Sequence, residues 1–453
     1  MNILPEPYSF LPRFLKLALV NALSYMMIPL AGVISVAFLG HLPDIKHLAG
    51  VALAAILFDY LYGAFGFLRL GTNALTAQAA GRDDQTEIFL TGMRNALIAL
   101  ALGLLVLLFQ YPLREIGFAI LSATPDVKTA GINYFNTRIL GAPAVLLNYV
   151  LIGWFLGQEK NGKVLLLTVI GNSANIIQDY IYINCWNWSS AGAGLSQAFS
   201  QYLTFLIGMA LVVFELLSQG VDITNQDAWK ISDFQAAFKF NANLLWRFLV
   251  IASTFAVFNS LGAIIGIDIL ATNALLLQLV MFSLFIGNGV GYATTTLSGN
   301  FKGQQTKHLF LPLLQIGIGT NLLLGLFLAL TVFFFPNPVF KILTNHTDLI
   351  ELAKIYVPWL LLAVGYGAIT LTLEGYLTGL AEAKIIRNAF LISSVLGFAP
   401  FTLLAWYYRN NHILWLALSM FTLVRGIILA IQIPKTLENN NTIQSSPTLQ
   451  TDD

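Results

Sequence analysis

One carboxylate with amide neighbours stands out in a strongly apolar part of the chain. Asn172, Asn175 and Asp179 are spaced i, i+3 and i+7, which places them on one face of a helix. Gln197 begins a comparable polar stripe on the next apolar segment, and a short hairpin would place the two stripes side by side. We therefore predict a polar cavity with one acid, in which Asp179 holds a cation or exchanges a proton. A hydrogen-bonded clamp between two helices, with no binding role, is the alternative.

Other ionisable side chains also lie within apolar segments, where a charge is costly unless it faces protein or water. Glu374, in GAITLTLEGYLTGL, is a second candidate for cation or substrate binding. The alternative for Glu374 is a place near the helix end, where a long side chain reaches water. Asp59 is a third candidate, with structural pairing as its alternative. We expect structural roles for Arg69 and Arg138.

Enzyme chemistry finds little support in the sequence. The single cysteine, Cys185, excludes an internal disulfide and a multi-cysteine metal site. GNGVG, from Gly287, looks like a dinucleotide-binding loop, but no strand precedes it. We expect no enzymatic activity, no metal and no cofactor. The histidines lie in loops or at the ends of apolar segments, never spaced as metal ligands: His41, His47, His308, His346 and His412.

These residues belong to a chain that must cross a membrane many times. Of its 453 residues, 57% are hydrophobic and 10% are charged, against roughly 25% charged in soluble domains. The apolar runs reach about 20 residues, enough for a membrane helix, and lack the pattern of barrel strands. We predict an all-α integral membrane protein with twelve transmembrane helices, near residues 14–39, 48–79, 91–113, 129–155, 164–183, 191–217, 241–266, 270–299, 309–335, 350–379, 387–408 and 412–434.

The predicted helices form two sets of six, separated by a polar segment. The expected domains are an N-terminal six-helix bundle at 1–218, a cytoplasmic linker at 219–240, a C-terminal six-helix bundle at 241–435 and a disordered cytoplasmic tail at 436–453. Pro29 removes a backbone hydrogen bond from the first helix and is a candidate hinge, with a static packing kink as the alternative.

Lysine and arginine indicate the orientation. By the positive-inside rule, both termini are expected to be cytoplasmic, in a plasma (inner) membrane. A formal net charge of +1 gives no indication of a nucleic-acid partner. The predicted cytoplasmic side holds Arg13, Lys16, Arg82, Arg94, Lys160, Lys163, Lys230, Lys239, Arg247, Lys302, Lys307, Lys384, Arg387 and Lys435, and the other side holds Lys46, Arg114, Lys128, Lys341, Lys354 and Arg409.

The second half of the chain repeats the first at an offset of 222 residues, without a gap. Glycine, tyrosine and aspartate positions keep this register: Thr72, Gly81, Asp126, Tyr134, Gly153 and Gly157 match Thr294, Gly303, Asp348, Tyr356, Gly375 and Gly379. Because each half has six spans, the two repeats enter the membrane from the same side and are parallel. Substrate sites of such carriers lie at the interface between repeats.

Several segments resemble the multidrug and toxic compound extrusion (MATE) family, in the branch similar to DNA-damage-inducible protein F. They are PLAGVISVAFLGHL, LAGVALAAILFDYLYGAFGFLRLGTNALTAQAAG, IGWFLGQEKNG, NSANIIQDY and LEGYLTGLAEAKIIRNA, and the resemblance covers residues of about 10 to 435. It implies two six-helix bundles around a central cleft that opens alternately to either side. It also implies export of organic, often cationic, compounds in exchange for protons or sodium.

The resemblance extends to single residues, with departures. Asn175 and Asp179 match the family's polar cluster on the fifth helix, and Glu374 stands where an acid of the tenth helix is usual. Three positions where relatives tend to carry acids are neutral here: Ser35 on the first helix, and Asn288 and Thr295 on the eighth. We include Ser35 and Asn288 among the candidate binding residues.

These features predict a secondary active transporter that exports organic, cationic or amphiphilic compounds, xenobiotics among them, by proton- or sodium-coupled antiport. The expected partners are a small organic substrate, the coupling cation and the lipid bilayer, and the expected state is a monomer. A lipid-linked or amphiphile flippase is the alternative, because neutralised acids and abundant aromatic residues suit a bulky amphiphile. A further alternative is that this protein is a relative of such transporters that has lost transport.

Overall fold

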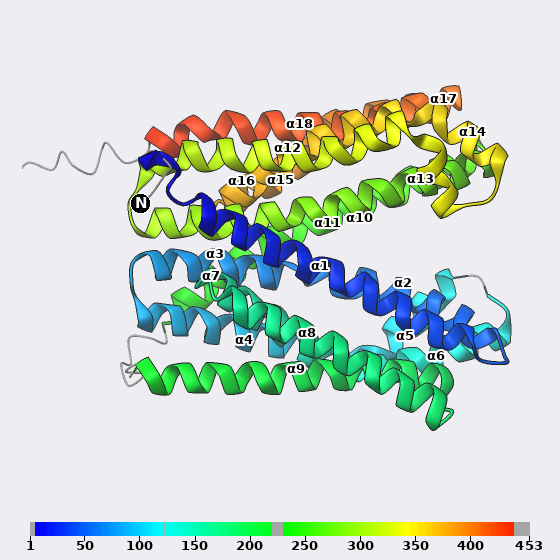
Figure 1. Cartoon of the computed structure of the whole chain (residues 1–453), viewed down its shortest axis with the longest axis horizontal. Helices are drawn as coiled ribbons and strands as arrows, with labels where there is room; N and C mark the ends of the chain where they lie inside the picture. The colour runs from blue at the N-terminus through cyan, green and yellow to red at the C-terminus, as the bar shows by residue number, and fades with distance from the viewer. Residues whose placement is uncertain (1–4, 122, 220–229, 439–453) are drawn as a thin grey trace, which may run out of the picture.

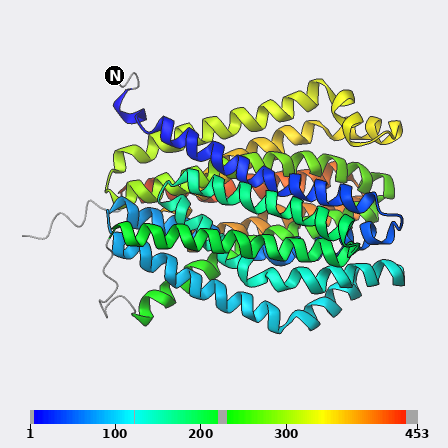
Figure 2. The same ribbon diagram turned by 60° about the horizontal axis from the view of Figure 1, so that its bottom comes forward.

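Helices make up nearly all of the regular structure in the computed structural model, which describes residues 5–121, 123–219 and 230–438. Within these ranges, twelve helical segments are long and apolar enough to cross a membrane, six before residue 220 and six after residue 230. The predicted all-α class and the number of spans are therefore confirmed. The helices run along the long axis of the molecule in both views (Figures 1 and 2).

The first six spans contain three that are interrupted. The second span breaks at Phe65 and Gly66, the fourth contains a 3-10 turn at Ile139–Gly141, and the fifth ends in a π-helix at Tyr180–Cys185. The helices of this half are α1 (Leu11–Gly40), α2 (Lys46–Ala64), α3 (Phe67–Gly81), α4 (Gln85–Leu108), α5 (Gln110–Ile120), α6 (Pro125–Arg138), α7 (Ala142–Gly157), α8 (Asn161–Asp179) and α9 (Ser189–Gln219).

The second six spans include two long unbroken helices, α10 and α11. The eleventh span carries a π-helix at Ser394–Phe398, between α16 and α17. The helices of this half are α10 (Ile231–Ile265), α11 (Ile267–Gly303), α12 (Phe310–Phe334), α13 (Pro336–Leu343), α14 (Thr347–Tyr356), α15 (Pro358–Gly379), α16 (Ala383–Ser393), α17 (Ala399–Tyr408) and α18 (Asn411–Glu438).

Two predicted spans have different bounds in the structure. The helix expected at 91–113 ends at Leu108, and the helix expected at 350–379 is divided into α14 and α15. Pro358 opens α15, where a missing N–H costs no helical hydrogen bond, so the chain is free to restart the helix there.

The predicted linker and tail are described only in part. Residues 231–240 of the linker form the start of α10, and residues 436–438 of the tail end α18. The remainder, 220–229 and 439–453, lies outside the described residues. The side chain of Pro29 does too, and because α1 runs unbroken through position 29, the hinge at Pro29 stays a prediction.

The helices form two lobes with α1 between them (Figure 1). The N-terminal lobe contains α2 to α9, and the C-terminal lobe contains α10 to α18. The first half of α1 packs on α11, where Phe10 contacts Phe301 and the backbone of Ala18 lies against Gly289. The second half of α1 lies against α8, where Phe38 contacts Tyr180. One helix therefore touches both lobes.

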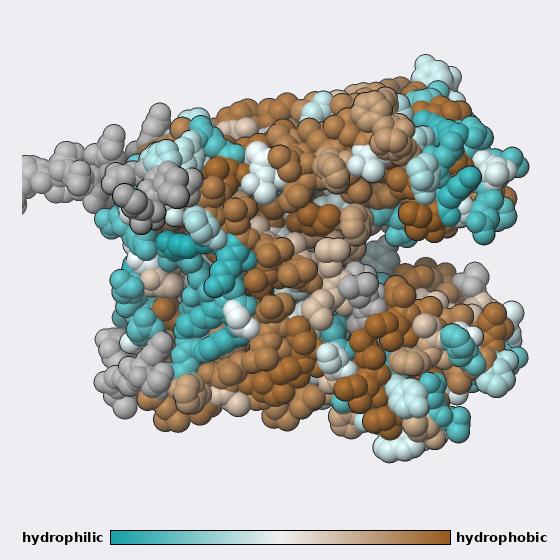
Figure 3. Space-filling model, viewed as in Figure 1, coloured by the Kyte–Doolittle hydropathy of each residue, from teal (hydrophilic) through white to brown (hydrophobic). Residues whose placement is uncertain are grey.

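The lobes meet tightly at the end of the molecule where α1 begins, which we call the closed end. There α3 and α11 pack so closely that a Cβ atom at Gly81 would overlap the carbonyl oxygen of Asn300, and one at Gly303 would overlap that of Gln78. Only glycine permits this approach. The opposite end, the open end, is hollowed between the lobes, and apolar residues cover the surface between the two ends (Figure 3).

Candidate functional site

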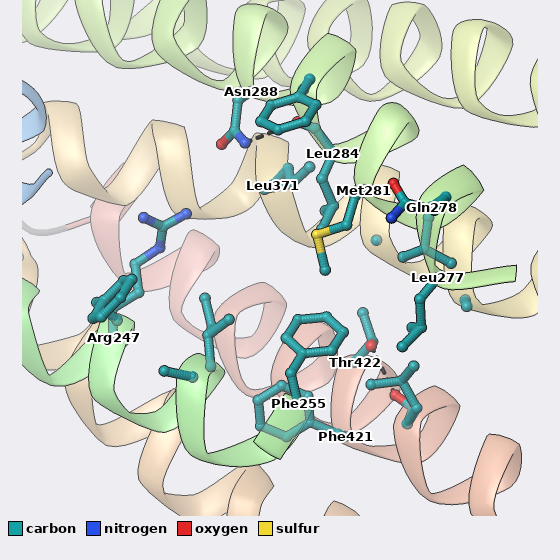
Figure 4. A pocket seen from close by; sticks show the side chains of 18 of the residues that line it. Arg247, Phe255, Leu277, Gln278, Met281, Leu284, Asn288, Leu371, Phe421 and Thr422 are labelled. Atoms are coloured by element: carbon teal, nitrogen blue, oxygen red, sulfur yellow. Dashed lines mark hydrogen bonds between the residues drawn. The ribbon is translucent and has the colours of Figure 1, made fainter. Parts of the chain in front are cut away.

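A cavity of about 570 Å³ lies mainly in the C-terminal lobe. Side chains of α10, α11, α15 and α18 line it, and α2 of the other lobe contributes Asp59 and Tyr60. Figure 4 shows Phe255, Met281 and Phe421 pointing into the same space, with Arg247 at one side. The predicted candidates Glu374, Asn288 and Asp59 all line this cavity.

The charged groups of this cavity are two arginines and two acids, and of the acids only Glu374 belongs to the same lobe as the arginines. The Nε atom of Arg247 donates to Oε2 of Glu374 at 2.9 Å, and Nε of Arg425 lies 3.1 Å from Oε1. Glu374 is only 4% exposed, and Arg425 is 7% exposed. The alternative for Glu374, a side chain that reaches water at the end of its helix, is therefore wrong. Two guanidinium groups share one carboxylate here.

Aromatic rings hold the arginine side chains in place. The guanidinium carbon of Arg425 lies 4.5 Å from the ring centre of Phe390 and 5.0 Å from that of Phe421. Such cation–π contacts stabilise a guanidinium that has left water. They also fix the direction in which the donors of Arg425 point.

The remaining walls of the cavity are mostly apolar and carry two neutral amides. Asn288 donates to the carbonyl oxygen of Leu284 at 2.8 Å and stays within its own helix, α11. Gln278 lies earlier on the same helix and also lines the cavity (Figure 4). Thr295, the other neutral replacement on α11, donates to the carbonyl oxygens of Gly291 and Gly375, and it joins α11 to α15.

The N-terminal lobe contains a second polar group, built around Asp179. One carboxylate oxygen accepts a hydrogen bond from Ser35 of α1, and the other accepts one from Ser196 of α9. Asn175 donates to Ser196 at 3.1 Å, and Gln197 donates to Asn175 at 3.0 Å. The two predicted stripes, on α8 and α9, do therefore meet. None of these five residues lines the cavity of the C-terminal lobe.

Asp179 is fully buried, and no lysine or arginine of the described residues forms an ion pair with it. It is the last residue of α8, directly before the π-helix at Tyr180–Cys185. A π-turn is often found at functional positions because it changes the direction of a side chain within a helix. Asn172, the third member of the stripe, donates to the carbonyl oxygen of Thr168 instead.

Arg69 and Arg138, for which structural roles were predicted, make contacts of that kind. Arg138 donates to the hydroxyl of Tyr134 at 2.8 Å and lies 4.4 Å from the ring centre of Phe58. Arg69 donates to Asn21 at 3.0 Å. Its guanidinium lies over the rings of Tyr25 on α1 and Tyr292 on α11, and it therefore joins the two lobes.

Sequence reasoning missed three residues of these sites. Arg425 lies in the middle of the last apolar segment, and a charge at that depth could have marked it. Arg247 was counted with the cytoplasmic charges, although it lies well inside α10. Ser196 carries no charge, and nothing in the sequence distinguishes it from the other serines. Within the described part of the chain, no three His, Cys, Asp or Glu side chains gather as a metal site would require.

Comparisons with known proteins agree with this architecture. The MatE family model matches residues 21–181 and 244–403, two segments separated by the repeat offset. DNA damage-inducible protein F of Escherichia coli K12 is 31% identical over 415 residues, covering 91% of this chain and 90% of that protein. The probable multidrug resistance protein NorM of Thermotoga maritima is 21% identical over 371 residues, covering 81% and 79%.

Solved structures share the fold over nearly the whole chain. A MATE transporter in a bent conformation superposes with a TM-score of 0.84 at 17% identity, covering 96% of both chains. An outward-facing multidrug resistance MATE transporter superposes with a TM-score of 0.83 at 18% identity, also covering 96% of both. The two-lobe arrangement, the matched segments and the identity to DNA damage-inducible protein F together show that this chain belongs to the MatE family, the multidrug and toxic compound extrusion (MATE) transporters.

Proposed function

We propose that this protein is a secondary active exporter of amphiphilic organic compounds, driven by proton or sodium antiport at Asp179. The observation that supports this most strongly is the isolation of Asp179, a fully buried carboxylate whose hydrogen-bond partners are two serine hydroxyls. A carboxylate removed from water is unstable as an anion unless a cation or a proton compensates its charge. Asp179 is therefore suited to bind and release one.

The ligands around Asp179 are compatible with either coupling ion. Ser35 and Ser196 provide hydroxyl oxygens beside the carboxylate, and Asn175 contributes an amide. Oxygen ligands of this kind suit a hard cation such as sodium. The same carboxylate in a dry site also suits a proton.

Coupling to the movement of the lobes would run through α1. Ser35 of α1 binds Asp179 directly, while the first half of α1 packs on α11 of the other lobe. A change in the charge of Asp179 alters the interaction with Ser35 and thereby favours one position of α1. In the state described here the lobes are in contact at the closed end, and the cavity lies beyond that contact.

The lysines and arginines support an orientation for this state. Arg82, Lys302 and Lys435 lie at helix termini of the closed end, together with Arg13 at the start of α1. By the positive-inside rule the closed end and both termini are cytoplasmic. The proposed location is the plasma membrane. The state described is then open to the outside.

The test is transport by the purified protein in proteoliposomes under an imposed pH or sodium gradient. Gradient-dependent movement of an organic probe, lost in Asp179→Asn, is the expected result. A flippase for lipid-linked or amphiphilic substrates is the second candidate, favoured by the apolar walls around Phe255 and Met281. Scrambling of a fluorescent lipid that does not depend on either gradient would support the flippase.

A further inference from the structure

The C-terminal lobe contributes more positive than negative charge to its cavity. Arg247 and Arg425 face a single acid of the same lobe, Glu374. The other acid of the lining, Asp59, belongs to α2 of the opposite lobe, is exposed, and has Arg138 as its charged neighbour. A cationic substrate that entered this lobe would meet two guanidinium groups. The carboxylate of Glu374 is already paired with both of them.

The hydrogen-bond donors of Arg425 are incompletely used. Although Nε of Arg425 lies 3.1 Å from Glu374, neither that nitrogen nor Oε1 of Glu374 has a hydrogen-bond partner of acceptable geometry. The other contact is long, from Nη2 to the hydroxyl of Thr370 at 3.4 Å. A guanidinium has five N–H donors in a planar fork, and more than nine-tenths of this residue is buried. A buried charge with free donors invites an anion.

The rest of the cavity suits the apolar body of a ligand. Phe255, Leu277, Met281 and Leu284 line it on two helices, and Phe421 lies both in the lining and under Arg425 (Figure 4). A volume of about 570 Å³ is within the range of sites for drug-sized molecules. An acidic group on the arginines would place an aromatic or aliphatic body against these walls.

We infer that the cavity of the C-terminal lobe selects amphiphilic organic anions, aromatic sulfonates or carboxylates, through Arg425 and Arg247. This names the substrate class of the proposed exporter and rests on that proposal. Carboxylates and sulfonates accept two parallel hydrogen bonds from a guanidinium, which a cationic or neutral amphiphile does not. Glu374 then holds the arginines in place in the empty cavity and competes with the substrate anion for them. The sequence predicted cationic or amphiphilic compounds, and this inference narrows that prediction to amphiphilic anions.

A matched pair of probes tests the charge preference. Binding of 2-naphthalenesulfonate and of (2-naphthylmethyl)trimethylammonium to the purified protein is measured by calorimetry, because the two share a ring and differ in charge. We expect the sulfonate to bind at least tenfold more tightly than the ammonium. Arg425→Gln should weaken sulfonate binding by about tenfold or more, as expected for a lost charge-assisted hydrogen bond, and Arg425→Lys should restore part of it.

Glu374→Gln gives the sharpest contrast. If Glu374 competes with the substrate, this variant binds the sulfonate more tightly than the unmodified protein. If the cavity is instead a cation site, the variant loses ammonium binding and the sulfonate is unaffected. Arg387→Gln, at a half-buried arginine on α16 that does not line the cavity, is the control and should change neither affinity.

The same probes in proteoliposomes separate this inference from the proposed function. Gradient-driven movement of the ammonium but not the sulfonate would overturn the anion preference and leave the exporter intact. Binding of the sulfonate that depends on Arg425, with no gradient-driven movement of either probe, would keep the site and overturn the exporter. Tighter binding of the ammonium, unchanged in Arg425→Gln, would overturn the inference by itself.

Discussion

Ser35 and Asp179, which are 144 residues apart in the chain, form a direct hydrogen bond between α1 and the end of α8. This bond lies in the N-terminal lobe, whereas the cavity with Arg247, Glu374 and Arg425 lies in the other lobe. The proposed ion site and the proposed substrate site are therefore separate. Ion and substrate would influence one another through the arrangement of the lobes and not by competition for one carboxylate.

Ser35→Ala should slow gradient-driven transport by roughly tenfold, because a hydrogen bond to a charged group contributes about 1.5–3 kcal/mol. Transport should not be abolished, since Asp179 and Ser196 remain. Initial rates in proteoliposomes measure the effect. Ser35→Thr keeps the hydroxyl and is the matched control. Equal rates for the alanine and threonine variants would show that Ser35 has no part in coupling.

Gly303→Ala should weaken the contact of the lobes at the closed end, because the added Cβ atom overlaps backbone of α3. Spin labels at Arg82→Cys and Gln304→Cys, in a Cys185→Ser background, report the separation of α3 and α11. We expect a larger population at long distance in the Gly303→Ala protein.

Gly319→Ala is the control for that experiment. A Cβ atom at Gly319 meets nothing within 4 Å, so this variant should give the same spin-label distances as the protein without the substitution. If the distribution of spin-label distances is unchanged in Gly303→Ala, the close packing of α3 on α11 is not what closes this end.

Glu374→Ala should destabilise the protein strongly, because it removes the shared carboxylate from the buried Arg425 and the half-buried Arg247. Removing one partner of a buried ion pair costs about 3–5 kcal/mol. Glu351→Ala removes an acid whose pairing with Lys354 is at the surface, and surface pairs contribute about 0–1 kcal/mol. Apparent melting temperatures in detergent compare the two. A similar small decrease in both would show that Glu374 does not compensate the arginines.

Cys185 offers a direct test of orientation, because it is exposed and follows α8 at the open end. A membrane-impermeant maleimide should label it in intact cells. Gln304→Cys in a Cys185→Ser background, at the closed end, should be labelled only after the membrane is permeabilised. The opposite pattern would reverse the proposed orientation.

Local periodicity predicted one half of the Asp179 group and could not predict the other. The spacing of Asn175 and Asp179 placed both on one face, and the stripe at Gln197 brought α9 beside them, as the hydrogen bond between Asn175 and Gln197 shows. Ser35 was included only because of the family resemblance, since its contact depends on where α1 crosses α8. Such a crossing is set by packing between distant segments, which periodicity does not encode.

The charged group of the other lobe shows the same limit. Glu374 was recognised as an acid inside a membrane helix, but its two partners lie on α10 and α18, far away in the sequence. Hydropathy found the twelve spans because each is a local property. The pairing of Glu374 with Arg247 and Arg425 is a tertiary contact, which hydropathy does not detect. Because of this pairing, Glu374 is a neutralised acid and not a free one.

In the proposed mechanism, Asp179 couples transport to an ion gradient. The most direct measurement is gradient-driven movement, in proteoliposomes, of whichever naphthalene probe the unmodified protein transports faster. Asp179→Asn should reduce this to the rate without a gradient while probe binding in the C-terminal lobe is retained, and Asp126→Asn, at an exposed acid, should transport normally. Full gradient-driven export by Asp179→Asn would contradict the account.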